Sequence, residues 1–380
     1  MNAASLRVFG ATATIVAGAV IVARIRLAFN KRRVISVFYH LHPSDVDEIP
    51  HLKTAMAQSD IHLAWSESIA DAPDNIDVLI KRIPTSDDLD RWPTLTHVLT
   101  PFAGPIPATQ QLVRERPKLT LHTAHFNAVS TAELCVTLLL AVAKGLVPRD
   151  SAFRSLSERN DKMWTPAFME PVTEPPTPTL AGKHVLVLGY GACGTRVART
   201  LNVLGMRVSA CRRRAATSPA FDGTATVYGI GALSQLLPTA SVVIVCLPGT
   251  RSTAGLLGAT EVALLPKGAL LVNVGRGSVV DERALYDALS SGHLGGAGLD
   301  VWYNYPMLQA SGLGDEPAQN LGPASRDCPF WSLPNVVMSA HRGQASDTKA
   351  PDRVKELARM LEELAATGTM PNAFDLEQGY

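Results

Sequence analysis

A glycine-rich turn is the first feature of this sequence that points to chemistry. Residues 189–194, GYGACG, follow the apolar run at residues 185–188 and precede a predicted helix that begins near Thr195. In a strand, turn and helix of this kind, the first glycine makes the tight turn, the second lets the backbone approach a pyrophosphate, and the third lets the helix pack on the strand. The spacing therefore predicts a dinucleotide site, with helix amides facing the phosphates. The residues expected there are Gly189, Gly191, Ala192, Cys193 and Gly194.

Three consecutive arginines follow the next predicted strand, residues 207–211. Sites that prefer NAD usually carry an Asp or Glu about 20 residues after the glycines, bound to the ribose hydroxyls. Arg212 occupies that position, Arg213 and Arg214 follow it, and no acid is nearby in the sequence. Guanidinium groups chelate a 2′-phosphate that a carboxylate would repel, so the triplet favours NADP over NAD. The competing interpretation is a solvated basic loop that tolerates either cofactor.

Length and composition limit the class of protein. A chain of 380 residues suits two domains. Its 35 basic and 34 acidic residues give no reason to expect nucleic acid as a partner. The five cysteines are scattered and include no C-x-x-C pair, so they are predicted to be reduced intracellular thiols, with neither a disulfide framework nor a metal site.

The first 33 residues are predicted to lie outside the fold. Residues 8–23 are apolar or small, a basic cluster follows them, and no acidic residue precedes Asp45. The run is shorter than the roughly 20 residues that cross a bilayer, although flanking arginines can extend a span by snorkelling. We expect a membrane anchor that leaves the rest of the chain on the cytoplasmic side, with an organelle import sequence as the main alternative. A secretory signal and a buried extra helix are less favoured.

Two α/β units with parallel sheets follow along the chain. The predicted strands are residues 34–39, 78–81, 97–100 and 119–122 in the first unit, and residues 185–188, 207–211, 242–246, 269–274, 296–301 and 336–339 in the second. The predicted helices include residues 49–59, 130–144 (capped by Ser130 or Thr131), 284–290 and 352–366. Residues 304–329 are predicted to form a long irregular loop.

Five motifs stand in a fixed order in this chain: LAGKHVLVLGYGACG, CLPGTRSTAGLL, LLVNVGRGSVVDERAL, GGAGLDVW and NVVMSAHRG. With them, the chain from about residue 35 to residue 380 resembles the D-isomer-specific 2-hydroxyacid dehydrogenases. The resemblance implies an NAD(P)-binding Rossmann domain (residues 129–340) inserted into a flavodoxin-like substrate domain (residues 34–128 and 341–380), with residues 1–33 as an extra apolar segment. It also implies a homodimer with residues 130–144 in the contact.

The resemblance further implies hydride transfer between NADP or NAD and a 2-hydroxy or 2-keto acid of the glyoxylate or hydroxypyruvate type. Arg276, after the strand at residues 269–274, matches the catalytic arginine that binds substrate, and a guanidinium grips a carboxylate through two parallel hydrogen bonds. His341 matches the acid–base histidine, whose imidazole titrates near neutral pH.

Tyr305 is where the sequence departs from the family pattern. The family normally has a glutamate five residues after the aspartate of its LDV motif, which is Asp300 here, and the glutamate pairs with the histidine. Tyrosine carries no charge at neutral pH, so the pKa of His341 should be lower and proton donation weaker, and Arg342 should act in the same direction. Three acids of the long loop would compensate by folding back: Asp315, Glu316 or Asp327. A working enzyme is favoured. A catalytically weak or inactive NAD(P)(H)-sensing binding protein is the alternative.

Other positions match the family one at a time. The cofactor is expected to meet Leu247, Pro248 and Asp300, and the substrate carboxylate is expected to meet the backbone of Phe102, Ala103 and Gly104. Lys81 and Arg82 either reach a larger acidic substrate or are solvated residues at the rim. The particular 2-hydroxy acid is left open.

Overall fold

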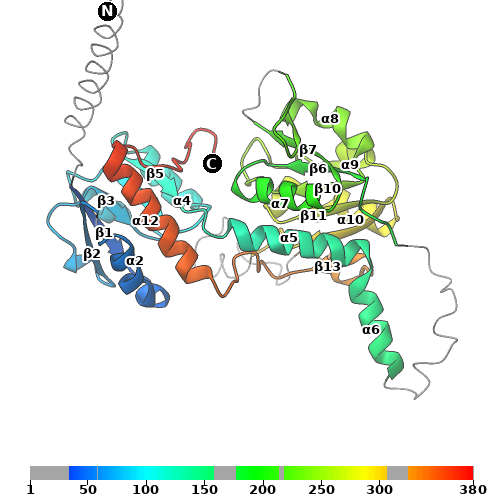
Figure 1. Ribbon diagram of the computed structural model, residues 1–380, viewed down its shortest axis with the longest axis horizontal. Coiled ribbons are helices and arrows are strands. Elements are labelled where there is room, and N and C mark those ends of the chain that lie inside the picture. The colour runs from blue at the N-terminus through cyan, green and yellow to red at the C-terminus, as the bar shows by residue number, and fades with distance from the viewer. Residues whose placement is uncertain (1–33, 58, 158–176, 214–217, 306–323, 380) are drawn as a thin grey trace, which may run out of the picture. The chain divides into compact units, whose positions relative to one another are not determined.

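The computed structural model describes residues 34–57, 59–157, 177–213, 218–305 and 324–379 (Figure 1). The predicted apolar segment at residues 1–33 and most of the predicted loop at residues 304–329 lie outside the described residues. The chain divides into two units by its contacts. The first unit is Met1–Pro101, Arg116–Ala124 and Val354–Ala373, and the second is Phe102–Glu115, His125–Arg353 and Phe374–Tyr380.

A five-stranded parallel sheet forms the centre of the first unit. Its order is β2 (Ile61–Ser66), β1 (Ile35–His40), β3 (Val78–Ile80), β4 (His97–Thr100) and β5 (Thr120–Thr123). This is the flavodoxin-like strand order. The accompanying helices are α2 (Ile49–Ala55), α3 (Ser86–Asp90) and most of α12 (Lys349–Thr367), with short 3-10 helices at Pro43–Glu48 and Ile69–Asp71.

The predicted strands of this unit are confirmed within one or two residues, but β2 was not predicted. Strands β1 and β3 read as apolar runs because both of their faces are buried, as the full burial of Phe38 and Leu79 illustrates. Strand β2 is an edge strand of intermediate burial that includes His62 and Ser66, so it carries no such run. The predicted helix at residues 49–59 is shorter in the structure and ends at Ala55.

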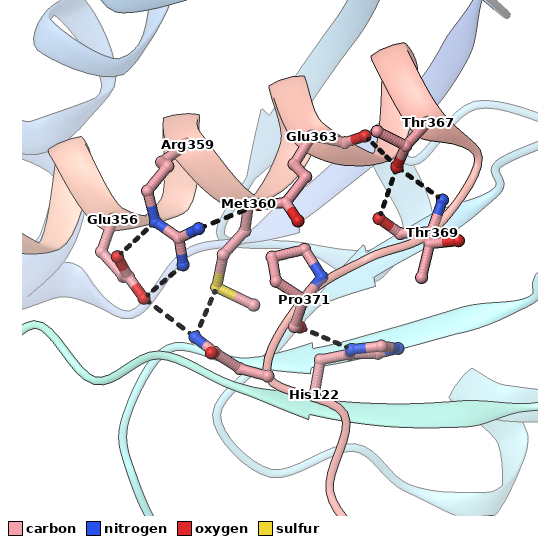
Figure 2. Close-up of polar contacts among 9 residues, drawn as sticks. His122, Glu356, Arg359, Met360, Glu363, Thr367, Thr369 and Pro371 are labelled. Atoms are coloured by element: carbon pink, nitrogen blue, oxygen red, sulfur yellow. Dashed lines mark hydrogen bonds and ion pairs between the residues drawn. The ribbon is translucent and has the colours of Figure 1, made fainter. Parts of the chain in front are cut away.

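Residues 371–373, which follow α12, bind to β5 through polar contacts (Figure 2). The ring Nδ1 of His122 lies 2.9 Å from the carbonyl oxygen of Pro371, and Ala373 forms an antiparallel bridge with His122. A carbonyl only accepts, so Nδ1 carries the hydrogen of this bond. Burial lowers the pKa of the ring, which keeps it neutral at pH 7. Asn372, at φ 54°, donates from its side chain to Glu356 at 2.9 Å. These contacts fix the chain as far as Ala373.

An eight-stranded sheet forms the centre of the second unit. Its order is β13 (Val336–Met338), β12 (Leu294–Leu299), β11 (Ala269–Asn273), β10 (Val242–Val245), β6 (His184–Leu188), β7 (Arg207–Arg212), β9 (Thr226–Gly229) and β8 (Ala220–Phe221). All neighbours are parallel except β8 with β9. The chain order reverses between β6 and β10. In open α/β sheets, such a switch point is where ligands bind, at the carboxyl ends of the strands.

Helices cover both faces of this sheet. On one face, α5 (Ala128–Ala143) and α7 (Ala192–Val203) pack side by side over a core that includes Leu139 and Val197 (Figure 1). The opposite core includes Leu236 and Leu285. It is covered by α8 (Leu233–Leu236), α9 (Ala259–Ala263) and α10 (Glu282–Ser290). Helix α6 (Leu146–Ser157), α4 (Pro107–Arg114) and short 3-10 helices at Ile230–Ala232, Leu237–Thr239, Gly277–Val279 and Phe330–Ser332 complete the unit.

Several predicted bounds in this unit are corrected by the structure. The helix after the glycine turn begins at Ala192, three residues before the expected Thr195. Helix α5 begins at Ala128, so neither Ser130 nor Thr131 caps it. Strands β8 and β9 were not predicted because both are short, β8 is exposed and β9 is only partly buried at the edge of the sheet.

Among the described residues, no single helix has the length and apolar character needed to cross a membrane. Only Ala128–Ala143 together with Leu146–Ala152, which are bent by 59° relative to each other, pass that test as a pair.

The buried ring of His122 predicts a loss of stability in acid. Burial lowers the pKa of His122 to about 4, whereas an unfolded histidine titrates near 6.5. Between these values the unfolded chain binds more protons, so stability falls as the pH is lowered through this window. We expect this residue to remove about 2 kcal/mol of the free energy of unfolding between pH 7 and pH 4.5. Urea unfolding of wild type and His122→Asn at both pH values measures it.

The control is His51→Asn, which changes an exposed histidine on α2. It should keep the pH dependence of wild type, whereas His122→Asn should flatten it. Equal slopes in wild type and His122→Asn would contradict the assignment.

Candidate active site

The glycine turn lies between β6 and α7, at the switch point of the sheet. Gly189 has φ +97°, and a Cβ there would lie 2.9 Å from the backbone carbonyl of Cys246. A Cβ on Gly194 would lie 1.8 Å from the Gly189 oxygen, so only glycine allows the helix to approach so closely. Around Gly191 the space is open to at least 4 Å, and no side chain caps the N-terminus of α7. This cradle fits a pyrophosphate.

The loop after β10 forms the neighbouring wall of the same cradle. Leu247 is nearly buried, and the backbone of Gly275, after β11, lies so near it that a Cβ would stand 2.4 Å from the Leu247 oxygen. The carbonyl oxygen of Pro248 accepts a hydrogen bond from the Thr253 hydroxyl at 2.6 Å, which braces the loop. The predicted cofactor residues of β6 and β10 are therefore brought together at one sheet edge.

Two of the three arginines lie at the end of β7, and Arg214 lies outside the described residues. Arg212 is exposed, whereas Arg213 is partly buried, with Nη2 4.0 Å from a carboxylate oxygen of Asp375. A second acid, Asp222, accepts a hydrogen bond from the Tyr190 hydroxyl at 2.7 Å. Burial and this carboxylate raise the pKa of Tyr190 to about 12. The sequence indicated no acid in this region, but the fold supplies two.

Arg276 follows β11 and precedes a 3-10 turn, where its backbone oxygen accepts a hydrogen bond from the Asn273 side chain at 2.9 Å. A Cβ on Gly104 would lie 2.7 Å from Nη2 of Arg276, so the predicted substrate loop and the predicted substrate arginine meet. The residue keeps exposed surface, yet partial loss of hydration lowers the pKa of the guanidinium, against which the Tyr305 phenol acts. Arginine remains protonated at neutral pH.

His341 lies just beyond β13 in a backbone conformation that side chains rarely adopt, with φ 55°. The buried carboxylate of Asp300 holds the turn around it. This carboxylate accepts hydrogen bonds from the Ser339 hydroxyl at 2.5 Å, the Arg342 amide at 2.6 Å and the Gly343 amide at 2.9 Å. These contacts show that Asp300 positions the histidine turn.

Helix α5 braces the same turn from the other side. The hydroxyls of Ser130 and Thr131 donate to the carbonyl oxygen of Gly343 at 2.8 and 3.0 Å. These two residues were expected to cap a helix. Their bonds to Gly343 could not be predicted, because Gly343 lies more than 200 positions away. Both backbone groups of Gly343 are thereby held in place.

The electrostatic surroundings of His341 differ from expectation in one respect. Burial and then the positive charge of Arg276 lower the pKa of His341, while the Asp300 carboxylate opposes them. The lowering charge is thus Arg276 rather than the neighbouring Arg342. Asp327 interacts with Arg283 and is not among the charges that act on His341. Asp315 and Glu316 lie outside the described residues.

Tyr305 lies against His341, with ring centroids 5.4 Å apart and planes inclined by 59°. Its hydroxyl oxygen accepts a hydrogen bond from the Trp302 amide at 3.0 Å, which fixes the ring. Burial raises the pKa of Tyr305, so the phenol is neutral at physiological pH. The position at which the family pattern has a glutamate is thus occupied by the uncharged ring of Tyr305, which lies against the imidazole.

Lys81 and Arg82 are engaged in ion pairs within the first unit. Lys81 binds Asp88 at 2.7 Å, and Arg82 binds the fully buried Asp45 at 2.6 Å. These contacts favour the interpretation of both as structural residues over contact with a large acidic substrate.

The described cysteines form no disulfide. Cys193 and Cys246 lie with their sulfur atoms 4.0 Å apart beside the glycine turn. Within the described residues, no three His, Cys, Asp or Glu side chains are grouped so as to hold a metal ion.

Comparison with known proteins places this geometry in a family. Residues 136–343 match the family described as D-isomer specific 2-hydroxyacid dehydrogenase, NAD binding domain. A Haemophilus influenzae protein named as a 2-hydroxyacid dehydrogenase is 31% identical over 208 residues, which are 55% of this chain and only 60% of that protein. The glyoxylate reductase of Thermococcus gammatolerans is 28% identical over 296 residues, which are 78% of this chain and 80% of that enzyme.

Solved structures show the same fold. The D-isomer specific 2-hydroxyacid dehydrogenase of Xanthobacter autotrophicus Py2, crystallised with NADPH and MES, superposes with a TM-score of 0.68 at 23% identity, covering 92% of this chain and 100% of that one. The matched family region spans more than half of the sequence and includes the glycine turn, Arg276 and His341. With its NAD-binding domain, the chain belongs to the D-isomer specific 2-hydroxyacid dehydrogenases.

Proposed function

We propose that this protein interconverts a 2-keto acid and the matching 2-hydroxy acid with NADP(H) as the favoured cofactor. The observation that carries the proposal is the coupling of Arg276 with His341. Both follow strands of the same sheet at their carboxyl ends, and the charge of one lowers the pKa of the other. A cation for a carboxylate and a titratable proton donor are the two groups that reduction of a keto acid requires.

Each residue has a defined part in this proposal. A reduced nicotinamide, when bound in the cradle, supplies a hydride to carbon 2 of the keto acid. Arg276 binds the substrate carboxylate, together with the backbone of Phe102, Ala103 and Gly104. His341 donates a proton to the carbonyl oxygen, and in the reverse direction it takes the hydroxyl proton. One hydride and one proton convert the carbonyl to an alcohol.

The choice of cofactor and substrate class rests on two supports. The basic end of β7 suits a 2′-phosphate, and the structurally similar Xanthobacter protein was crystallised with NADPH. The Thermococcus relative is named a glyoxylate reductase, so we propose a small substrate of the glyoxylate or hydroxypyruvate type. The division into a substrate domain (residues 34–128 and 341–380) and an NAD(P)-binding domain (residues 129–340) belongs to the same proposal, as does a membrane contact through residues 8–23.

Tyr305 supports a second function. Without a carboxylate beside His341, a protein that binds NADP(H) without turnover is the competing proposal. The imidazole still lies near Asp300, whose charge raises its pKa, and near Arg276, a cation that suits a substrate carboxylate, and both features favour catalysis.

Turnover separates the two functions. We expect wild type to oxidise NADPH in the presence of glyoxylate, hydroxypyruvate or a larger 2-keto acid. Arg276→Lys should lower kcat/KM about 10- to 100-fold, because a paired charged hydrogen bond worth about 1.5–3 kcal/mol is lost. Steady-state kinetics followed by NADPH absorbance measure both.

The control is Arg283→Lys, the same substitution at an exposed position on α10, which should leave kcat/KM unchanged. Tight NADPH binding without turnover of any 2-keto acid would favour the binding protein instead.

The pH dependence tests the role of Tyr305. Since the pKa of His341 is lowered and the donor must be protonated, kcat/KM for reduction should fall as the pH rises through a value below 6.5. In Tyr305→Glu, a carboxylate beside the ring favours the imidazolium, so the fall should move about one pH unit higher. Rate profiles from pH 5 to about pH 9 resolve the two curves.

Tyr305→Phe serves as the matched control, since it keeps the ring and adds no charge. An upward displacement in Tyr305→Phe equal to that in Tyr305→Glu would exclude the electrostatic explanation. Coincident profiles for all three proteins would exclude His341 as the donor.

A homodimer with α5 in the contact is also part of the proposal. Large apolar side chains are exposed on α5 and α6, namely Val129, Leu140, Leu146 and Val147. Exposed apolar patches of this kind mark association surfaces. Light scattering should give twice the mass of the chain, and Leu146→Lys should shift the mass toward that of the monomer. A monomeric mass for wild type at micromolar concentration would refute the dimer.

A further inference from the structure

The last residues of the chain lie against the loops that surround the proposed cofactor site. Phe374–Tyr380 belongs by its contacts to the second unit, which carries the glycine turn, and it is described as far as Gly379. Its Asp375 lies 4.0 Å from Arg213 at the end of β7. Its Gly379 runs so near the loop after β10 that a Cβ there would stand 3.3 Å from Cγ2 of Thr250. Strands β7 and β10 flank β6, which carries the glycine turn.

Residues 374–379 form a hydrogen-bonded turn that orients the carboxylate of Asp375. One oxygen of Asp375 accepts the amides of Glu377 at 3.1 Å and Gln378 at 3.0 Å, which leaves the other oxygen directed to Arg213. The carbonyl oxygen of Leu376 accepts a hydrogen bond from Arg114 at 2.6 Å. Both members of the Asp375–Arg213 pair are about 30% exposed, so water only partly screens it.

The chemistry of this contact bears on the choice of cofactor. A guanidinium binds carboxylate and phosphate through the same donors, so Asp375 and a 2′-phosphate compete for Arg213. A phosphate monoester carries about −1.5 to −2 charge near pH 7 and is the stronger ligand. A cofactor without that phosphate leaves the carboxylate in place.

We infer that Asp375 is a specificity-determining residue that weakens binding of the 2′-phosphorylated cofactor by competing for Arg213. The inference rests on the proposed NADP(H) site. Asp375 supplies a carboxylate at the end of β7, where the local sequence has none. The C-terminal turn therefore sets how strongly the protein distinguishes NADPH from NADH.

Measurements of cofactor binding test the role of Asp375 without requiring catalytic turnover. NADPH and NADH fluorescence titrations of the full chain give both dissociation constants. Asp375→Asn keeps the turn, because the amide oxygen accepts the same two backbone amides, and it removes the competing charge. We expect NADPH affinity to rise about two- to fivefold, NADH affinity to change less than about 1.5-fold, and the gain to shrink at 1 M salt.

Glu377→Gln is the matched control, since it removes the same charge from an exposed position two residues away. It should leave the NADPH/NADH ratio at the wild-type value. An equal rise in NADPH affinity for Glu377→Gln and Asp375→Asn would overturn the inference, because it would show a general charge effect. An unchanged ratio in Asp375→Asn would overturn it as well.

Arg213→Ala separates this inference from the proposed cofactor preference. If Asp375 acts through Arg213, Asp375→Asn should give no further gain in the Arg213→Ala background. Persistence of the gain there would overturn the inference. If Arg213→Ala and Arg212→Asp both leave the NADPH/NADH ratio unchanged, the NADP(H) proposal itself fails. If Arg213→Ala weakens NADPH binding while Asp375→Asn has no effect, only the inference fails.

Discussion

The geometry of the candidate active site depends on the hydrogen bonds that the buried carboxylate of Asp300 accepts. A buried charge is costly unless hydrogen bonds compensate it, and this one accepts three, from the hydroxyl of Ser339 and the amides of Arg342 and Gly343. It thereby joins the end of β12 to the turn after β13. The left-handed backbone of His341 costs on the order of 1 kcal/mol or more, and these bonds offset it. The imidazole can face Arg276 only while the turn is held this way.

Close packing of backbone at the strand ends is the second constraint. Gly189, Gly194 and Gly275 stand where any Cβ would overlap the backbone of a neighbouring turn. Their loops therefore stack edge to edge, whereas the space around Gly191 stays open. The pyrophosphate cradle thus combines three close backbone contacts that leave no room for a side chain with one open position. At that open position, Gly191, a side chain would fit in the free protein. That distinction indicates that Gly191 is small for the sake of a ligand.

Much of this fold and site could be predicted from the sequence, because buried parallel strands leave continuous apolar runs and the glycine turn has a fixed spacing. The edge strand β2 escaped prediction for lack of such a run. Two contacts of acids also escaped prediction, Asp222 with Tyr190 and Asp375 with Arg213, since the partners are far apart in the sequence and only the tertiary fold brings them near. The same is true of Ser130, whose bond to Gly343 joins residues far apart in the chain. Local sequence patterns identify strands and turns, but they do not show which charged side chains come into contact in the fold.

The charges around His341 suggest how the proposed reaction could proceed without the glutamate of the family pattern. Arg276 lowers the pKa of His341 as long as its own charge is uncompensated. In the proposed reaction, a substrate carboxylate bound to Arg276 would offset that charge, so binding of a keto acid would favour protonation of the imidazole when a proton is required. A fixed glutamate would hold the proton whether or not substrate were present, whereas the neutral ring of Tyr305 leaves the control to the substrate. Asp375 lies 4.0 Å from Arg213, and in the proposed cofactor site a 2′-phosphate would replace it there. In both proposals, the anion bound to an arginine would determine the state of the groups around it.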